Sequence, residues 1–380
     1  MMTPKRLVKA SASLLILLFA AGLLIGGLGI YYITYLEVNN LSTQVSHLQS
    51  QVSGFTGFQN ATTQNITILQ NGTSLANIYQ SVFNSVVLLQ GDTSTGTVQG
   101  SGFVYNFEGQ NVVLTNYHVV QGTTGLSVTF SDGNGYSATV LGKDPYSDLA
   151  VVSVNNAPAS ELKPVTIVSS SSLNVGETVI AIGNPYGLVG SLTTGAVSAL
   201  GRTITEDTAG GFAIANIIQT STPINPGNSG GPLLNAVGNV IGITTAIVSN
   251  SQGLGFAIPS NTILREISAL VTSGSYHGHS YLGVTGEDMD YTTAQQTGAN
   301  VTYGWKIATV VSGGPSDGKL NVGDIVIALN NQTIRNNDDL ASYLEERTLP
   351  GDSLVLTVVR GSSQMPITVV LGERPASSGS

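Results

Sequence analysis

Between residues 76 and 260 the chain repeats one local pattern, in which a short apolar, β-branched run is followed by glycine, asparagine, aspartate or serine. Examples are SVVLLQG, NVVLTN, LAVVSV, ETVIAIG and NVIGITTAIV. Many short strands at this spacing are typical of an all-β barrel or sandwich, because the glycine and polar residues allow tight turns. Strands do not alternate with helices, which argues against a doubly wound α/β sheet. We therefore predict a mainly β domain over residues 76–273.

The chain downstream of these runs has two further patterns. Residues 261–272 (NTILREISALVT) have apolar side chains at helical spacing, with Ser260 or Asn261 as a suitable N-cap. Residues 281–374 combine strand-like runs such as DIVIALN and SLVLTVVR with one helix near 337–346, which predicts a small α+β domain. The remaining segments are interpreted as a linker at 274–280 and a tail at 375–380.

The N-terminal segment predicts a membrane anchor. Residues 14–33 are apolar or small and carry no charge, and a run of this length can cross a bilayer. Three basic residues precede it within the first nine positions, and the next lysine or arginine is Lys143. This asymmetry predicts a cytoplasmic N-terminus at 1–12, a transmembrane anchor at 13–36 and an extracytoplasmic remainder. A cleaved signal peptide is the alternative interpretation.

A stalk is predicted at residues 37–75. Apolar residues from Val38 to Phe55 alternate spacings of three and four, which is an a/d pattern over fewer than three heptads. A lone amphipathic helix and a short oligomerising coiled coil both fit this pattern.

Composition narrows the chemistry that the chain can perform. It has no cysteine, which excludes disulfides, cysteine-ligated metals and a cysteine nucleophile. The formal net charge is −9 and no basic run follows residue 9, so we expect no nucleic-acid partner. Hydrophobic residues make up 41% of the chain, which is enough for a packed core.

The stretch INPGNSGGPL places Ser229 among glycines that let the backbone turn tightly and expose its N–H groups. Such N–H groups can stabilise the oxyanion of acyl transfer, but a serine nucleophile also needs a base. Three of the four histidines lie in the stalk or the linker, which leaves His118, at the expected end of the strand in VVLTNYHVV. A carboxylate should orient that base, and Asp148 in DPYSDLAVV is the candidate, with Asp144 as a rival.

Residue order separates the possible chemistries of this serine. The G-x-S-x-G pattern also fits an α/β-hydrolase, but that fold needs the acid and the histidine after the serine and a helix following it. A phosphate-binding loop would need a lysine after the glycines. The order His118, Asp148, Ser229 is instead that of chymotrypsin, which agrees with the β-rich surroundings.

Five separated motifs, TNYHVV, SDLAVV, GNPYG, INPGNSGGPLLN and GLGFAIPS, together resemble the HtrA (Deg) family of serine proteases. The segment from YLGV to VVLGERP resembles the PDZ domain of that family. The resemblance implies two chymotrypsin-like β-barrels with the active site in the cleft between them. It implies His118 as general base, Asp148 as its orienting partner and Ser229 as nucleophile, with the backbone N–H groups of Gly227, Asn228 and Ser229 as the oxyanion hole. It also implies a homotrimer or larger homo-oligomer and no metal or organic cofactor.

Two positions depart from the family pattern. Tyr117 stands where a small residue is common, and Ser221 stands where aspartate is common. Residues 201–213 resemble the sensor loop of the family and residues 249–253 a specificity-pocket loop. Candidate S1-pocket residues are Ile224, Thr244 and Ala246; because none is acidic, we expect a small or medium apolar P1 residue.

In the PDZ-like region, Tyr281, Leu282, Gly283 and Val284 resemble the carboxylate-binding loop, whose N–H groups would hold a peptide C-terminus. Leu340 and Leu344 are four residues apart on the predicted helix, and they line the groove or belong to the domain core.

The sequence thus predicts a membrane-anchored, extracytoplasmic HtrA-type serine endopeptidase that cleaves unfolded or exposed polypeptides and binds C-terminal peptides at its PDZ domain. The alternative is a catalytically silent, PDZ-bearing binding or chaperone-like protein.

Overall fold

A computed structural model of the 380-residue chain describes residues 35–37, 39, 74–184, 190–205, 213–225, 227–245 and 254–375. The chain divides into two units, Met1–Gly72 and Thr73–Ser380, and the few described residues of the first unit are helical. The predicted anchor at 13–36 and stalk at 37–75 lie almost entirely outside the described residues. Of the helices within the described ranges, none has both the length and the apolar character of a membrane span.

The second unit begins with a short helix, α2 (Leu75–Val82), and a 3-10 turn, η1 (Phe83–Ser85). The Ser74 hydroxyl accepts a hydrogen bond from the Asn77 amide at 3.2 Å, which caps the helix. Ile78 and Val82 are buried and anchor α2 to the main core.

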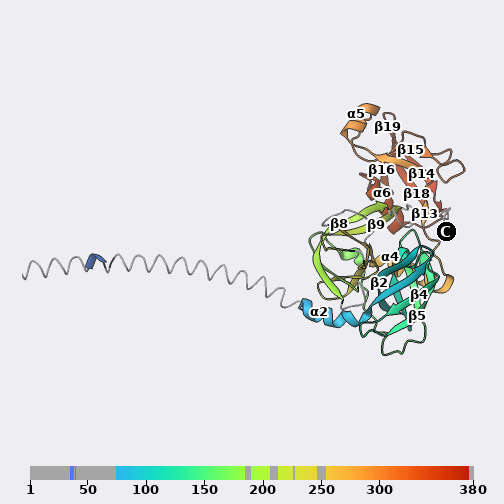
Figure 1. Cartoon of the computed structure of the whole chain (residues 1–380). Helices are drawn as coiled ribbons and strands as arrows, with labels where there is room; N and C mark the ends of the chain where they lie inside the picture. Colours follow the sequence, from blue (N-terminus) through green and yellow to red (C-terminus); the bar gives the residue numbers. More distant parts are fainter. Residues whose placement is uncertain are drawn as a thin grey trace, which may run out of the picture. The chain divides into compact units, whose positions relative to one another are not determined.

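The first sheet is a closed, six-stranded antiparallel barrel (Figure 1). Its strands in spatial order are β1 (Val86–Thr93), β2 (Gly96–Phe107), β3 (Gln110–Thr115), β6 (Leu149–Val154), β5 (Gly135–Asp144) and β4 (Gly125–Thr129). Both faces of β3 and β6 are buried: Val113 and Val152 pack in one core cluster, Leu114 and Val151 in another. Since successive side chains point to opposite faces, burial of both faces explains why these strands are continuous apolar runs.

The second sheet closes in the same way. Its strands in spatial order are β10 (Pro232–Asn235), β11 (Val240–Thr245), β12 (Gly255–Pro259), β9 (Ala213–Thr220), β8 (Ser191–Thr205) and β7 (Thr178–Gly183). In β7, Val179 and Ala181 pack in one cluster and Ile180 and Ile182 in another, so this run is also buried on both faces. A 3-10 turn, η2 (Ser170–Ser172), precedes β7. The expectation of two barrels in a mainly β domain is confirmed.

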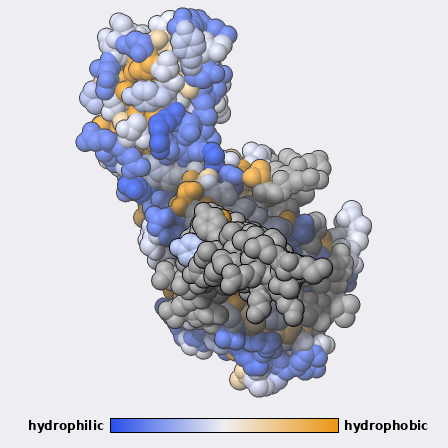
Figure 2. Space-filling view, turned by 90° about the vertical axis from the view of Figure 1, so that its left-hand side faces the viewer, coloured by the Kyte–Doolittle hydropathy of each residue, from blue (hydrophilic) through white to orange (hydrophobic). Residues whose placement is uncertain are grey.

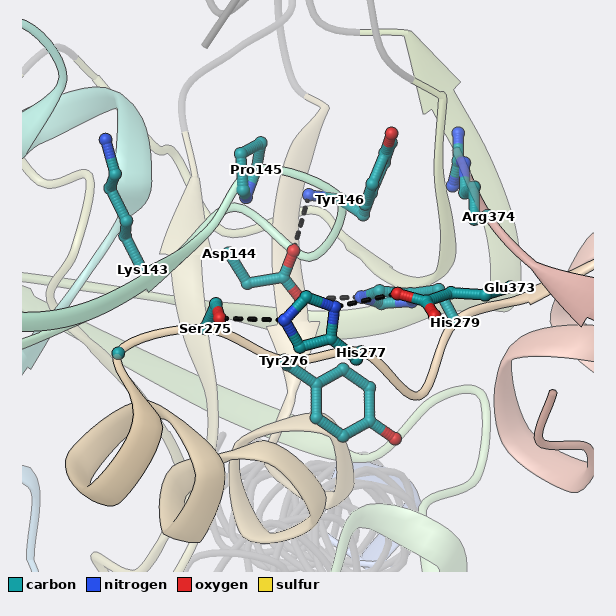
Figure 3. Close-up of a pocket in the computed structure, with 11 residues that line it drawn as sticks. Lys143, Asp144, Pro145, Tyr146, Ser275, Tyr276, His277, His279, Glu373 and Arg374 are labelled. Atoms are coloured by element: carbon teal, nitrogen blue, oxygen red, sulfur yellow. Dashed lines mark hydrogen bonds and ion pairs between the residues drawn. The ribbon is translucent and has the colours of Figure 1, made fainter. Parts of the chain in front are cut away.

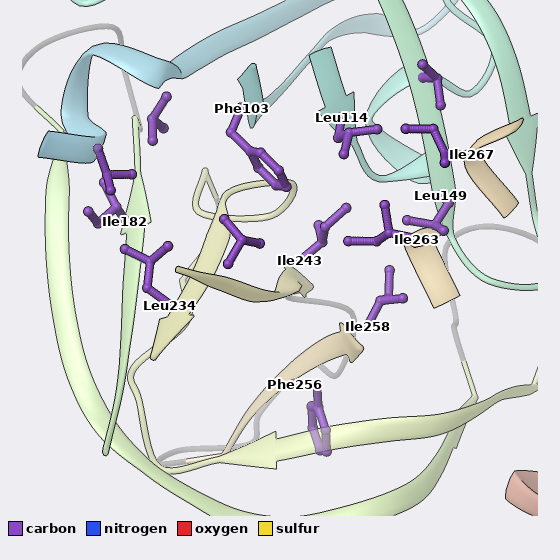
Figure 4. Close-up of a cluster of buried hydrophobic side chains, with 14 of the residues drawn as sticks. Phe103, Leu114, Leu149, Ile182, Leu234, Ile243, Phe256, Ile258, Ile263 and Ile267 are labelled. Atoms are coloured by element: carbon purple, nitrogen blue, oxygen red, sulfur yellow. The ribbon is translucent and has the colours of Figure 1, made fainter. Parts of the chain in front are cut away.

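One hydrophobic cluster joins the two barrels to a helix (Figure 4). Its labelled members are Phe103, Leu114 and Leu149 of the first barrel, Ile182, Leu234, Ile243, Phe256 and Ile258 of the second, and Ile263 and Ile267 of helix α4. Because this core spans both barrels, it fixes them against each other.

Helix α4 (Ser260–Ser273) follows the last barrel strand. The predicted cap is wrong: Pro259 occupies the N-cap position, while the Ser260 hydroxyl donates to the Val168 carbonyl at 2.6 Å. The helix lies directly on β5, where a Cβ atom at Gly142 would be 2.1 Å from the Leu270 carbonyl oxygen. Glycine at this position therefore permits the contact between strand and helix.

Residues 280–373 form an α+β domain (Figure 1). The main sheet has the order β14 (Val284–Asp288), β15 (Trp305–Val310), β16 (Ile325–Leu329), β18 (Ser353–Arg360) and β19 (Ser363–Val370), with β17 (Gln332–Thr333) beside β16. The other elements are the β13 (Ser280–Tyr281) and β20 (Gly372–Glu373) pair, helix α5 (Tyr291–Thr297) and helix α6 (Asn337–Arg347). Helix α5 was not predicted. The core of the α+β domain includes Trp305, Leu340 and Leu356.

Figure 2 shows a coloured surface that is mostly hydrophilic, with hydrophobic side chains in small separate groups.

Candidate active site and peptide groove

His118 lies on α3 (Tyr117–Val120), a single helical turn that begins after β3 and the N-cap residue Asn116. The sequence placed this histidine at the end of a strand, whereas the strand stops at Thr115. Tyr117 and Val119, its neighbours, are buried, and this fixes the turn that carries the imidazole.

Asp148 is fully buried in the loop between β5 and β6 and has a φ of +50°. Its Oδ1 accepts from the His118 amide at 3.0 Å, and its Oδ2 lies 2.9 Å from His118 Nδ1. Oδ2 also accepts from the Thr245 hydroxyl at 3.1 Å, and the Asp148 carbonyl accepts from the Asn116 side chain at 3.1 Å. A left-handed backbone costs a non-glycine residue about 1 kcal/mol, and these bonds hold it there.

Ser229 lies in the turn before β10 and is 5% exposed. Its carbonyl accepts from the Ser101 amide of the first barrel at 2.7 Å. The next residue, Gly230, has a φ of +86°, and a Cβ atom there would be 2.0 Å from the Ser101 carbonyl oxygen. Glycine is therefore required on both conformational and steric grounds. The Gly230 amide donates to the Thr244 carbonyl, one residue from the Thr245 that binds Asp148.

Two hydroxyl groups support this turn. The Ser101 hydroxyl donates to the Gly227 carbonyl at 2.6 Å and accepts from the Asn184 amide at 2.8 Å. The Thr244 hydroxyl lies 2.6 Å from the Asn228 carbonyl oxygen. The sequence does not single out Ser101, and it predicts Thr244 only as an S1-pocket residue, because neither contact with the turn is local along the chain.

The amides of the turn differ in their partners. The Asn228 amide donates to the Asn225 carbonyl at 2.9 Å, so it already has a hydrogen-bond partner within the turn, and its place in the oxyanion hole stays a prediction. A buried amide with a good hydrogen-bond partner is stable, and turning that amide toward a ligand would break the existing hydrogen bond. The amides of Gly227 and Ser229 stay candidates for the oxyanion hole on the sequence resemblance.

The candidate S1 residues fall in different surroundings. Ile224 is half-buried against the core of the second barrel, and a Cβ atom at Gly255 would be 2.8 Å from its Cγ1. Thr244 is fully buried and bonded to the turn. Ala246 lies outside the described residues, as do residues 249–253 and part of 201–213.

Both departures from the family pattern have partners in the structure. Tyr117 is buried, and the Lys143 ammonium lies 5.6 Å from its ring centroid, within the range of a cation–π contact. The Ser221 hydroxyl accepts from the Ala196 amide at 3.0 Å, which ties the segment before the serine turn to β8.

A cavity of about 230 Å³ lies between the start of the α+β domain, helix α6, and strands β8 and β9 of the second barrel. Its lining includes all six residues predicted for the peptide groove, which are Tyr281, Leu282, Gly283, Val284, Leu340 and Leu344. Leu340 and Leu344 also pack in or against the domain core, so groove and core are not exclusive alternatives for them.

Helix α6 is bound to the second barrel. The Asp338 carboxylate pairs with Arg202 at 3.0 Å and accepts from the Thr203 amide at 2.8 Å. Further along the helix, Glu346 accepts from the Asn216 side chain at 2.8 Å.

A buried ionic cluster lies where β5, α4 and α6 meet. His279 is 4% exposed and bonds to Asp144 at 2.6 Å and to Glu345 at 3.1 Å. Burial alone would lower the pKa of His279, but these bonds outweigh it and raise the pKa to about 10. Burial would raise the pKa of Glu345, but the hydrogen bond from His279 and the charges of His279 and Arg265 lower it to about 2. The sequence pattern predicts only a linker at His279, so this buried role is a finding of the structure.

Glu266 completes this cluster from α4. It is fully buried, and its Oε1 accepts from the Ser147 hydroxyl and from Arg265, both at 2.7 Å. Burial and the nearby charge of Asp144 raise the pKa of Glu266 well above its usual value. Asp144, Glu266 and His279 offer ligand atoms within 4.8 Å of one another, a spacing that could suit a metal ion. Because Asp144 and Glu266 already bind His279 and Arg265, we interpret the group as an ion-pair network.

Comparison with known proteins agrees with this geometry. Residues 100–243 match the family described as trypsin-like peptidase domain, and residues 280–371 match the PDZ domain family. A probable periplasmic serine endoprotease, DegP-like, from Chlamydia muridarum is 38% identical over 286 residues, which cover 74% of this chain and 55% of the relative. The putative serine protease HhoB of Synechocystis is also 38% identical, over 74% of this chain and 68% of the relative.

Solved structures give the same result. The HtrA-type protease AlgW with tripeptide is 32% identical and superposes with a TM-score of 0.65, over 81% of this chain and 99% of that chain. The same protease with decapeptide gives 30% identity and a TM-score of 0.63, over 80% and 100%. The chain spans about half the length of the first curated relatives it matches. With a trypsin-like peptidase domain followed by a single PDZ domain, the chain belongs to the HtrA (Deg) family of serine proteases.

Proposed function

We propose that the protein is a serine endopeptidase in which His118, Asp148 and Ser229 form the catalytic triad. The observation that carries this proposal is the pairing of His118 Nδ1 with Asp148 Oδ2 at 2.9 Å. The Ser229 turn is attached to the same junction, through Thr244 and Thr245. Histidine and serine thus come from different barrels, as an active site in the cleft between them requires.

In this mechanism Asp148 holds the proton of His118 on Nδ1, so Nε2 is the basic nitrogen. His118 accepts the Ser229 hydroxyl proton as Oγ attacks the peptide carbonyl. The amides of Gly227 and Ser229 stabilise the resulting oxyanion. His118 then gives the proton to the leaving amine, which leaves an acyl-enzyme, and water releases the second product by the same steps in reverse order.

The proposed substrates are unfolded or exposed polypeptides, with an apolar P1 residue received near Ile224. Support comes from the AlgW structures, which contain a decapeptide or a tripeptide, and from the cavity that the PDZ loop shares with α6. A peptide C-terminus would bind at Tyr281–Val284 and add to the edge of β14. Apolar residues 14–33 and the periplasmic DegP-like relatives support a membrane-anchored, extracytoplasmic location. A homotrimer remains the expected assembly from family membership.

The test compares the full chain with its Ser229→Ala variant in cleavage of unfolded casein and in labelling by a fluorophosphonate probe. We expect the wild type to cleave and to be labelled on Ser229, and the variant to do neither. Equal cleavage by both proteins would refute the triad. No labelling of the wild type, with or without C-terminal peptides, would instead favour the silent binding protein.

A further inference from the structure

The side chains of the ionic cluster, together with a short stretch of backbone, form a closed ring of contacts between the PDZ domain and the protease domain. From Glu345 one branch runs through His279 to Asp144, with distances of 3.1 and 2.6 Å. The other branch runs from Glu345 through Arg265 to Glu266, and Glu266 binds the Ser147 hydroxyl at 2.7 Å. Backbone from Asp144 to Ser147 closes the ring.

The ring ends on the loop that presents the proposed catalytic carboxylate. Asp144 is the last residue of β5, and its Oδ1 accepts from the Tyr146 amide at 2.9 Å, which shapes the turn (Figure 3). Ser147 is 2% exposed and directly precedes Asp148. Contacts of the ring thus hold both Asp144 and Ser147. The next residue, Asp148, has a left-handed backbone, a conformation that the loop would not keep if these contacts were lost.

The other end of the ring lies at the peptide groove. Glu345 follows Leu344 on α6, and both residues line the cavity that includes the carboxylate-binding loop. Glu345 is the one acidic group that serves both branches, since it binds His279 and Arg265. Removal of its charge would leave two cations in a buried site with one fewer anion, which is the costly way to break a buried pair.

We propose that Glu345 is a positioning residue for Asp148, acting from the PDZ domain through the His279–Asp144 and Arg265–Glu266–Ser147 branches. This inference rests on the proposed function, because it concerns the geometry of the same triad. It makes the PDZ helix part of the support of the active site within one chain. An intact ring holds Asp148 against His118; a broken ring leaves binding of substrate unchanged and slows the chemical step.

The test uses Glu345→Gln in the full chain, with Glu346→Gln as matched control. Glu346 is the next residue on α6 and also binds the protease domain, through Asn216, but it lies outside the ring. We expect Glu345→Gln to lower kcat at least tenfold with KM within twofold of wild type, and Glu346→Gln to change neither. A loss that appears equally in both variants would indicate general loosening of the domains and would overturn the proposal.

A second variant approaches the ring from its protease end. Ser147→Ala removes one hydroxyl and no charge, so it tests the contact even if Glu345→Gln fails to fold. We expect a lower kcat at unchanged KM, and a double variant that loses less than the product of the single losses, because both act on one path. A wild-type kcat for Ser147→Ala, or losses that multiply, would overturn the proposal. Failure of the proposed function is distinguishable, since wild type would then not differ from Ser229→Ala.

Discussion

The pKa of His279 leads to a prediction about stability that does not depend on proteolysis. The imidazole is buried between Asp144 and Glu345 and its pKa is raised to about 10, whereas an unperturbed histidine titrates near 6.5. A pKa raised on folding adds stability that is complete below the unfolded pKa and is lost as the pH rises through the folded pKa. The affected window is therefore pH 6.5 to 10.

The size of the effect follows from the shift. The difference between the unfolded and folded pKa of His279, at 1.36 kcal/mol per pKa unit, sets an upper limit of about 5 kcal/mol on what this group adds to the free energy of unfolding. Between pH 7 and pH 9 linkage predicts a loss of about 2 kcal/mol in the free energy of unfolding from this group. His279 is only 4% exposed, so solvent screening takes little from this figure.

The assay is urea denaturation of the Ser229→Ala form, which avoids self-cleavage, at pH 7, 8 and 9. His279→Gln should unfold at lower urea than its parent at pH 7 and should lose much less stability toward pH 9. His277→Gln is the matched control: it lies two residues away, pairs with Glu373, and its side chain is 72% exposed. We expect it to follow the parent at every pH. If His279→Gln lost as much stability between pH 7 and 9 as the parent, the conclusion that His279 is protonated in the ring would be refuted.

Two further predictions concern the turn and the groove. Gly230→Ala should lower kcat in the casein assay about 100-fold, because the added Cβ would displace the Ser101 carbonyl beside Ser229. Gly133→Ala is the control: its φ of +91° is similar, but the added Cβ would lie in open space, so it should keep the wild-type rate. Wild-type kcat for Gly230→Ala would contradict the geometry of the turn. Leu344→Ser should weaken binding of a fluorescent C-terminal peptide about tenfold through lost apolar contact, measured by anisotropy. Leu349→Ser, at an exposed position, should bind as wild type, and equal affinity of both variants would contradict the groove assignment.

Much of the fold could be predicted from the sequence because its signals are local. Runs such as NVVLTN and ETVIAIG are strands buried on both faces, and the turn residues between them mark their ends. The two barrels, the PDZ domain and the family follow from those runs and from five motifs in order. The triad residues remain predictions, supported by the contact between His118 and Asp148.

The sequence could not predict features that arise from contacts between distant segments. Asp144 was a rival for the role of Asp148, yet it lies 2.6 Å from His279, 135 positions away. Nothing near Glu266 or Glu345 in the sequence distinguishes them from solvated helix positions; only the packing of α4 and α6 buries them. The bond from the Asn228 amide to Asn225 likewise depends on turn geometry that the residue types alone do not specify.

The closure of both barrels has a consequence for how such a protein can meet its substrates. In the described part of the protease domain, each barrel strand has a hydrogen-bonded neighbour on either side, so neither sheet has an edge strand. An exposed edge would recruit extended chains indiscriminately and seed aggregates. In the C-terminal sheet, by contrast, β14 and β19 are outer strands, and Val284 at the start of β14 lines the cavity beside helix α6. One of these two outer strands, β14, therefore begins beside the loop that we propose to bind the terminal carboxylate of a peptide.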